Sequence, residues 1–353
     1  MDITNKTIWQ ISAGDTNRNY ADVCLQWDVI LNGPGSAGKL PDCEKTLREI
    51  WKVSERKLTD LRRFVDEIKD GDIVVLRVGT AQVYGVGKVH GDYDHCHEFG
   101  DVDGWDLEHI RRVVWKWKYN GSPKTFPTYA MKLGDTVQRL DSQEVKDWLT
   151  TLNDEGSQDI GPRSLPQLSQ EIKAEEISEY LFAQGISNIA IQNLSNQIDE
   201  LVRIARWYQG YGNPSEAETI TYLVVPLLRA LGWTPQKMAI EWNRVDVALF
   251  HKLPRQPQHL TVVVEAKLKG SSCLTAKSQA QAYAENPAYK DCQRLIVTDG
   301  LRYGVYKKKG DTFPDNPVAY LNLTQMREGY PILECAGAKK AFFYMSSDWI
   351  DSE

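Results

Sequence analysis

The chain has 353 residues, 42% of them hydrophobic and 25% charged, so it is long enough to bury two cores of ordinary size. Its six cysteines are scattered and form no C-x-x-C pair, which excludes a disulfide framework and indicates reduced thiols. We find no signal peptide and no apolar run of membrane-spanning length, and therefore expect a cytoplasmic protein without a membrane partner.

The net charge of −6 at first argues against a nucleic-acid partner, but the charge is unevenly distributed. Residues 153–200 carry nine acids and two bases, which leaves the remainder of the chain at +1. The charge therefore does not exclude DNA as a partner.

Residues 1–150 are expected to form a β-rich domain. Short strands are predicted at residues 6–12, 72–78 and 83–88, joined by glycines and aspartates. Aromatic side chains are dense, including tryptophans at positions 9, 27, 51, 105, 115 and 117. An all-β barrel with a few helices fits this pattern best.

Two motifs in this domain resemble ligand sites. Residues 33–39 follow the pattern of a phosphate-binding loop, but Leu40 replaces the hydroxyl residue and Pro41 disrupts the helix that should follow. We therefore expect no nucleotide cofactor. The run His95-Cys96-His97 suggests zinc, yet adjacent ligands cannot wrap a tetrahedron and no second pair lies at finger spacing. We interpret it as a polar loop.

Several pieces of this region together resemble an EVE-type domain of the PUA superfamily. They are residues 8–12, 28–30, 33–35, 71–77, 85–87, 104–107 and 111–113. The resemblance implies a small β-barrel that takes a flipped, often modified, base into an aromatic pocket. Candidates for this pocket are Trp9, Trp27 and Trp105, with Asp28 as an acceptor for an exocyclic amine, while core packing is the alternative for each tryptophan. The candidate contacts to the DNA backbone, which a solvated surface would explain equally well, are Arg77, Arg111, Arg112, Lys116 and Lys118.

Residues 151–190 are expected to form an acidic linker that ends in a helix. From Ile191 onward, apolar residues then recur every three or four positions, at 191, 194, 198, 201 and 205. We favour an amphipathic helix that packs on its own domain. The alternative is self-association into a homodimer, which matters because one nuclease site cuts one strand.

A helix is predicted at residues 215–231, with Ser215 as its cap and Gly232 at its end. Helical spacing places Glu216 on the apolar face, whereas Glu218 points nearly opposite. A carboxylate on a buried face needs a cation, so Glu216 is a candidate metal ligand. The alternative is that both acids only favour the helix N-terminus through its dipole.

Two further carboxylates lie at the ends of short apolar strands. Asp246 closes a strand that is predicted to begin near Ile240. Residues 261–264 form a β-branched strand, and the alternation of side chains then sends Glu265 and Lys267 to the same face. Hard oxygen ligands suit Mg²⁺, or Mn²⁺ in its place.

Downstream, the four-residue spacing of Gln279 and Tyr283 places both on one side of a helix. Strands are predicted at residues 294–298 and 303–306, and residues 311–353 are expected to pack on this domain as a C-terminal extension.

Residues 203–309 resemble the PD-(D/E)xK nuclease superfamily, and within it the N-terminal nuclease domain of type I restriction enzyme R subunits. The matching residues are Glu216, Pro226-Leu227-Leu228, Leu231-Gly232-Trp233, Arg244 to Asp246, Glu265 to Lys267, Gln279 and Tyr283. The resemblance implies that Glu216, Asp246 and Glu265 hold Mg²⁺. It also implies that Lys267 acts on the attacking water, while Gln279 positions Lys267 or the scissile phosphate.

We therefore expect an α+β or α/β protein of two domains, a PUA/EVE-like barrel at residues 1–150 and a PD-(D/E)xK core at 191–310. The function that this implies is a modification-dependent, type IV-like restriction endonuclease, acting on double-stranded DNA that carries a modified, cytosine-derived base. One alternative is a defence nuclease whose first domain binds RNA or a protein. The other is a nucleic-acid-binding module without catalysis.

Overall fold

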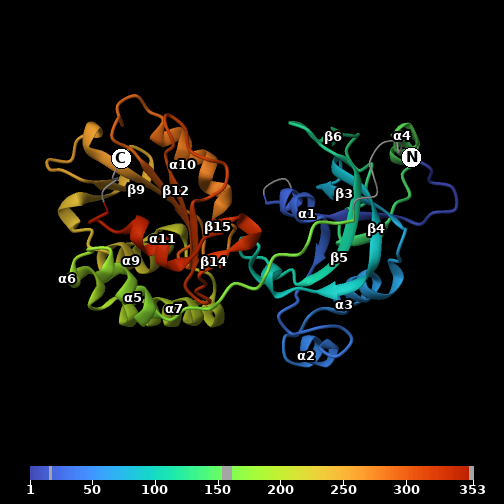
Figure 1. The fold of residues 1–353 in the computed structure, drawn as a ribbon, viewed down its shortest axis with the longest axis horizontal. Helices are drawn as coiled ribbons and strands as arrows, with labels where there is room; N and C mark the ends of the chain where they lie inside the picture. The colour runs from blue at the N-terminus through green and yellow to red at the C-terminus, as the bar shows by residue number, and fades with distance from the viewer. Residues whose placement is uncertain (16–17, 153–160, 350–353) are drawn as a thin grey trace. The chain divides into compact units, whose positions relative to one another are not determined.

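The computed structural model describes residues 1–15, 18–152 and 161–349, and the chain divides into two compact units, residues 1–167 and 168–353 (Figure 1). Each unit is built on one mixed β-sheet, so the protein is of the α+β class with two β-rich domains. Among the described helices, none combines the length and the apolar character that crossing a membrane requires.

The sheet of the first unit has seven strands in the order β2-β5-β4-β3-β1-β7, with β6 paired to β4. Their bounds are β1 Ile8–Ser12, β2 Val29–Asn32, β3 Ile73–Val78, β4 Gln82–His95, β5 His109–Lys118, β6 Lys124–Thr125 and β7 Val137–Arg139. Within the described residues no pairing joins β2 to β7, so the sheet is open and is not the closed barrel that we predicted. The edge strands, of four and three residues, offer few backbone groups for closure.

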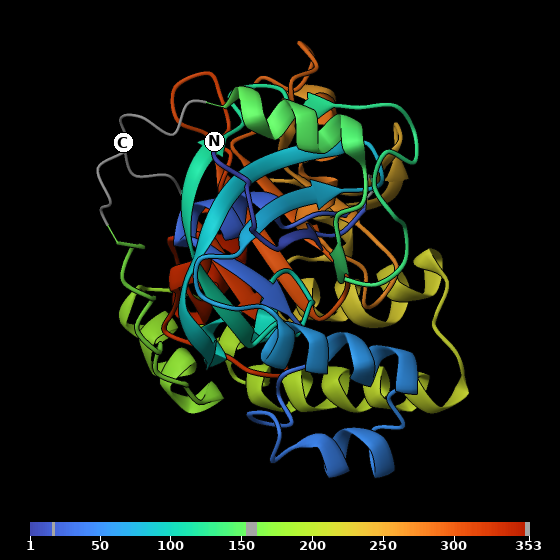
Figure 2. The same ribbon diagram turned by 90° about the vertical axis from the view of Figure 1, so that its right-hand side faces the viewer.

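Both faces of this sheet are buried at β3, where all six residues are enclosed. On one face Ile73 and Val75 share a core with Val145 and Leu149 of α4, the helix that lies across the strands in Figure 2. The helices are α1 Ala21–Trp27, α2 Glu44–Glu49, α3 Glu55–Arg62, η1 Arg63–Glu67, η2 His97–Asp101 and α4 Gln143–Thr151.

The second sheet has eight strands in the order β14-β15-β13-β12-β11-β10-β9-β8. Their bounds are β8 Met238–Trp242, β9 Val245–Phe250, β10 Leu260–Ala266, β11 Arg294–Thr298, β12 Arg302–Lys307, β13 Ala319–Asn322, β14 Gly329–Tyr330 and β15 Cys335–Ala336. Residues after 310 thus extend the sheet itself by three strands, in addition to packing against it.

Helices cover both faces of the second sheet. They are α5 Ala174–Ala183, α6 Asn188–Ile191, α7 Leu194–Tyr211, α8 Glu216–Thr219, η3 Ile220–Val224, α9 Val225–Ala230, η4 Pro235–Lys237, η5 Pro257–His259, η6 Leu274–Ala276, α10 Lys277–Ala284, η7 Pro331–Leu333 and α11 Ala338–Met345. One core joins α5, α7, α9 and α11 to the face that carries Val262 and Val264. Helix α10 contacts β10 and β11 and lies apart from these helices in Figure 1.

The apolar stripe of α7 is part of that core. Leu194, Ile198, Leu201 and Ala205 are all buried in it. The stripe therefore packs within its own unit, as the favoured interpretation predicted, and is not exposed for pairing with a second copy.

Candidate active site

Two carboxylates and a lysine come together at one end of the second sheet. Asp246 lies on β9 and Glu265 on β10, and the two strands pair antiparallel with Val247 opposite Val264. The amide of Ala266 donates to Oδ2 of Asp246 at 2.7 Å, and Lys267 Nζ lies 3.3 Å from Glu265 Oε1. Strand alternation and register therefore bring these three side chains to one edge.

Asp246 reaches this edge by a route that the sequence did not predict. It does not close a strand, because β8 ends at Trp242 and Asp246 stands near the start of β9. Between them Asn243 and Arg244 both have positive φ, 51° and 74°, in a two-residue hairpin turn that pairs Trp242 with Val245. Without a glycine, this turn carries little sequence signal.

The ammonium of Lys267, which contacts Glu265, also forms a hydrogen bond with a residue of helix α10. Lys267 Nζ donates to Gln279 Oε1 at 3.0 Å, and Gln279 Nε2 donates to the hydroxyl of Tyr283 at 3.3 Å. The backbone amide of Lys267 donates to Thr298 O on β11 at 2.8 Å. The lysine is thus fixed by a neighbouring strand and by the Gln279–Tyr283 pair that the four-residue spacing predicted to share a helix face.

The carboxyl group of Glu265 is held in an unfavourable environment for its charge. Its residue is 1% exposed, and this burial, together with the charge of Asp246, raises its pKa to about 7 against the opposing effect of Lys267. Burial also raises the pKa of Asp246. Within the described residues Glu265 Oε2 is buried without a hydrogen-bond partner. A cation would satisfy this oxygen.

Glu216 and Glu218 differ in their contacts. Glu218 forms a capping box, because its Oε2 accepts from the amide of Ser215 at 2.8 Å while Ser215 Oγ accepts from the amide of Glu218 at 3.2 Å. Glu216 is exposed, and its charge is close enough to raise the pKa of Glu265, though less than the other causes do. The ligand atoms of Glu216, Asp246 and Glu265 do not all lie within 4.8 Å of one another in the described structure.

The exposure of Glu216 differs from the prediction, which placed it on the buried face. The helix is not regular, since the π-helical turn η3 separates α8 from α9. Pro226 has no amide hydrogen to donate one turn back, which favours such a turn. The wider turn changes the phase of the first helical residues relative to the later ones.

These contacts predict different effects for two matched substitutions. For the Mg²⁺-dependent nuclease that the resemblance implies, Glu216→Gln is expected to raise the Mg²⁺ concentration for half-maximal cleavage by about ten-fold, as removal of an outer partner of a metal site typically does. Glu218→Gln is expected to have almost no effect, since glutamine also completes a capping box. Titrations of cleavage rate against Mg²⁺ test this, and the reverse pair of phenotypes would transfer the role to Glu218.

In the first unit, Trp105 lines a cavity of about 330 Å³, large enough for a small ligand. The guanidinium of Arg18 lies 4.2 Å from the Trp105 ring, and the ring of Tyr20 meets it edge-on at 5.5 Å. Trp105 Nε1 and Arg77 Nε are buried without hydrogen-bond partners among the residues described. The lining residues are Ser12, Gly14, Asp15, Tyr20, Arg77, Gly79, Trp105, Leu133, Gly134 and Thr136.

The other residues proposed for the base pocket lie elsewhere. Trp9 is fully buried and its Nε1 donates to Asp72 at 2.8 Å. Trp27 is buried under the guanidinium of Arg163 at 4.0 Å. Asp28 Oδ1 lies 3.2 Å from Lys118 Nζ, so the Asp28 carboxylate forms an ion pair within the protein. None of Trp9, Trp27 and Asp28 lines the Trp105 cavity.

The five bases proposed for the DNA backbone do not form one exposed path. Arg77 and Arg111 are 1% and 3% exposed, and Arg111 donates to Phe64 O at 2.8 Å, so both are interior residues. Arg112, Lys116 and Lys118 keep partial or full exposure. Arg77 instead belongs to the Trp105 cavity. That Arg18 and Tyr20 contact Trp105 could not be predicted from the sequence, because they are far from it along the chain.

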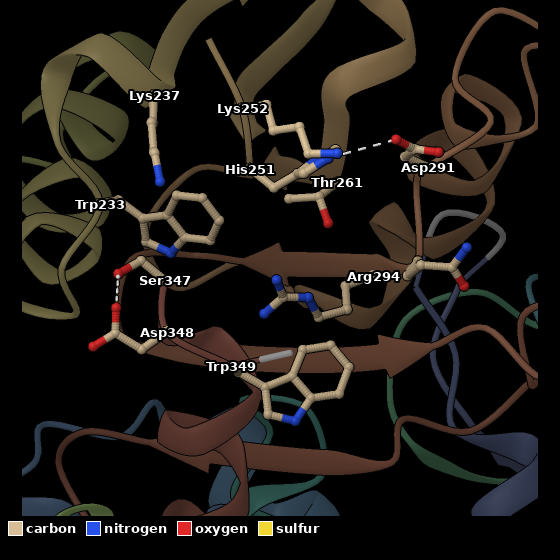
Figure 3. Close-up of a pocket in the computed structure, with 11 residues that line it drawn as sticks. Trp233, Lys237, His251, Lys252, Thr261, Asp291, Arg294, Ser347, Asp348 and Trp349 are labelled. Atoms are coloured by element: carbon tan, nitrogen blue, oxygen red, sulfur yellow. Dashed lines mark hydrogen bonds and ion pairs between the residues drawn. The ribbon is translucent and has the colours of Figure 1, made fainter. Parts of the chain in front are cut away.

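A second cavity, of about 580 Å³, lies at the opposite end of the second sheet. Its walls include Thr261 at the start of β10 and His251 after the end of β9, whereas Glu265 and Asp246 occupy the other ends of these strands. Figure 3 shows the guanidinium of Arg294 between the rings of Trp233 and Trp349, 4.4 Å from the latter. This cavity is therefore separate from the carboxylate cluster.

Comparison with known proteins gives one family match. Residues 9–141 match the family described as "Domain of unknown function (DUF8426)". No curated protein matches the chain, and no solved structure does so either. The matched region coincides with the sheet of the first unit and includes Trp105.

Proposed function

We propose that this protein is a Mg²⁺-dependent DNA endonuclease that is directed to its target by a modified base. The observation that supports this most strongly is the convergence of Asp246, Glu265 and Lys267 at one end of the paired strands β9 and β10, with Gln279 bound to the lysine. This is the arrangement that the resemblance to PD-(D/E)xK nucleases implies.

The side chains fit a hard divalent cation. Asp246 and Glu265 offer carboxylate oxygens, and the buried Oε2 of Glu265 has no hydrogen-bond partner within the described chain. These two residues would hold Mg²⁺ or Mn²⁺, with the exposed Glu216 contributing charge nearby. When bound, the cation activates water and neutralises charge on the departing oxygen.

The protein's own groups supply orientation. The amide of Ala266 fixes the carboxylate of Asp246, and Gln279 holds the ammonium of Lys267 beside Glu265. An ammonium in this place can orient a water molecule or a phosphate oxygen, because its third N–H donor is left over from the two contacts described. The side chain of Lys267 is 26% exposed, so a water molecule or a phosphate oxygen can reach it.

Target selection is assigned to the first unit. A cavity walled by Trp105, Tyr20 and Arg77 can enclose a flipped base by stacking and hydrogen bonding, whereas phosphate and metal contacts carry no base information. The partner is then double-stranded DNA with a modified, cytosine-derived base. Because one active site cuts one strand, a double-strand break requires either two copies or two successive binding events, and two copies would have to join through a surface other than the buried stripe of α7.

A single assay tests this function. The protein is incubated with Mg²⁺ and with matched DNAs that carry cytosine, 5-methylcytosine, hydroxymethylcytosine or glucosylated cytosine. We expect cleavage of at least one modified DNA in preference to the unmodified one. Equal cleavage of all four would assign the first unit to an RNA or protein partner, and binding without cleavage under Mg²⁺ or Mn²⁺ would indicate a non-catalytic module.

The raised pKa of Glu265 predicts a pH dependence that varies with Mg²⁺. Below about pH 7 this carboxyl holds its proton, and only the ionised form holds a cation, so at limiting Mg²⁺ the cleavage rate should rise as the pH increases through about 7. At saturating Mg²⁺ the midpoint should move to lower pH, because the cation displaces the proton. A midpoint that is independent of Mg²⁺ in rate profiles would contradict the assignment.

A further inference from the structure

Two histidines and a glutamate converge at the end of the β4–β5 hairpin in the first unit. His95 is the last residue of β4, His97 begins η2, and Glu108 immediately precedes β5. Glu108 Oε2 lies 2.9 Å from His97 Nδ1 and 3.2 Å from His95 Nε2. The potential ligand atoms of all three residues lie within 4.8 Å of one another.

These separations match those between ligands of a tetrahedral metal site. Zinc bonds of 2.0 to 2.1 Å place neighbouring ligand atoms roughly 3.3 Å apart. His95 Nε2 lies 2.9 Å from the carbonyl oxygen of Gly35. To bind a metal ion through this nitrogen, the neutral imidazole would give up this hydrogen bond, and the ion would take its place. Two imidazoles and one carboxylate are a donor set found in three-ligand Zn²⁺ sites.

The surroundings support a binding site rather than a surface pair. The side chains of His95 and Glu108 are 8% and 7% exposed, which is unusual for a glutamate without a cation. Gly100 makes room for the Glu108 side chain, because a Cβ at position 100 would lie only 2.4 Å from Glu108 Oε1. His109, which packs against His95 at 5.5 Å, is engaged at both ring nitrogens by Tyr93 and Pro34 and is therefore not a ligand.

We propose that His95, His97 and Glu108 form a Zn²⁺ site with one open coordination position in the first unit. The side chain of His97 is 64% exposed, so the site opens to solvent on its side. Three protein ligands leave the fourth position for water or another small ligand. The ion would join the ends of β4 and β5 through η2. From the sequence, the His-x-His run is interpreted as a polar loop, because the third ligand, Glu108, is brought to it only by the pairing of β4 with β5.

The test uses the full chain with Zn²⁺, and with Co²⁺ as a spectroscopic substitute, in excess Mg²⁺ to occupy the oxygen-only site of the second unit. We expect one Zn²⁺ per chain by calorimetry and a visible Co²⁺ absorption typical of tetrahedral coordination. His97→Gln and Glu108→Gln should each weaken Zn²⁺ binding by at least about ten-fold, the loss that even an outer-shell change produces. The matched control is His90→Gln, which changes an exposed histidine on β4, the strand that ends at His95. This variant should bind Zn²⁺ with wild-type affinity.

Because His97 is exposed, its substitution should leave the fold intact, which circular dichroism checks in each variant. Added Zn²⁺ should also raise the thermal midpoint of the wild type, since an ion that binds only the folded state stabilises it, but not that of His97→Gln. Absence of saturable Zn²⁺ binding, or wild-type affinity in both His97→Gln and Glu108→Gln, would overturn the proposal.

Discussion

Replacing Glu265 with glutamine should abolish Mg²⁺-dependent cleavage and at the same time stabilise the metal-free protein at pH 8. The first effect follows from loss of a charged ligand of the proposed Mg²⁺ site, which would remove several kcal/mol of transition-state stabilisation and lower the rate by at least about 100-fold. The second follows from the burial that raises the pKa of this carboxyl from 4.5 to about 7.

The sign of the stability effect follows from proton binding. Between about pH 4.5 and pH 7 the folded protein retains a proton on Glu265 that the unfolded chain has released, so the free energy of unfolding falls as the pH rises through this window. At pH 8 the ionised carboxylate destabilises the fold by up to about 3 kcal/mol, and glutamine removes this penalty.

Cleavage assays, and thermal unfolding in chelator at pH 5 and pH 8, measure both effects. The gain in stability of Glu265→Gln over wild type should be larger at pH 8. Asp246→Ala and Lys267→Ala should also lose cleavage, whereas Glu285→Gln, which changes an exposed acid at the end of α10, is the matched control and should cut normally. A wild-type rate in Glu265→Gln, Asp246→Ala or Lys267→Ala would contradict the active-site assignment.

Local periodicity explains which parts of this site could be predicted. The alternation of a strand places Glu265 and Lys267 on one face, and the spacing of a helix aligns Gln279 with Tyr283, and the structure shows both contacts. Each of these relations is set by residues only a few positions apart. The contact between Lys267, which follows β10, and Gln279 on α10 could be predicted only from the resemblance to a known family.

Features set by irregular backbone could not be predicted in the same way. The turn at Asn243 and Arg244 moves Asp246 from the end of one strand to the start of the next, although neither residue is a glycine. The π-turn η3 interrupts the regular helix on which the placement of Glu216 was based, and Glu216 is exposed. In the first unit, composition alone could not separate core tryptophans such as Trp9 from Trp105, because the difference depends on what packs over each ring.

The residue expected to control target choice is therefore Trp105, and Trp27 provides a matched control. Both rings carry an arginine against one face, Arg18 at 4.2 Å and Arg163 at 4.0 Å, but only Trp105 lines the cavity. Trp105→Leu should remove a stacking contribution of about 1 to 3 kcal/mol, which corresponds to a loss of roughly 5- to 150-fold in preference for modified DNA. Trp27→Leu should lower thermal stability and leave the preference unchanged.

Competition cleavage of modified and unmodified DNA in one reaction measures this preference directly, and it does so independently of the amount of folded protein. Cleavage of unmodified DNA by Trp105→Leu should persist, because Asp246, Glu265 and Lys267 belong to the other unit and contact no base. If Trp105→Leu kept its preference while Trp27→Leu lost it, the cavity would not be the reader. Selection would then depend on the surface that carries Arg163 and Lys118, where Asp28 already binds both residues.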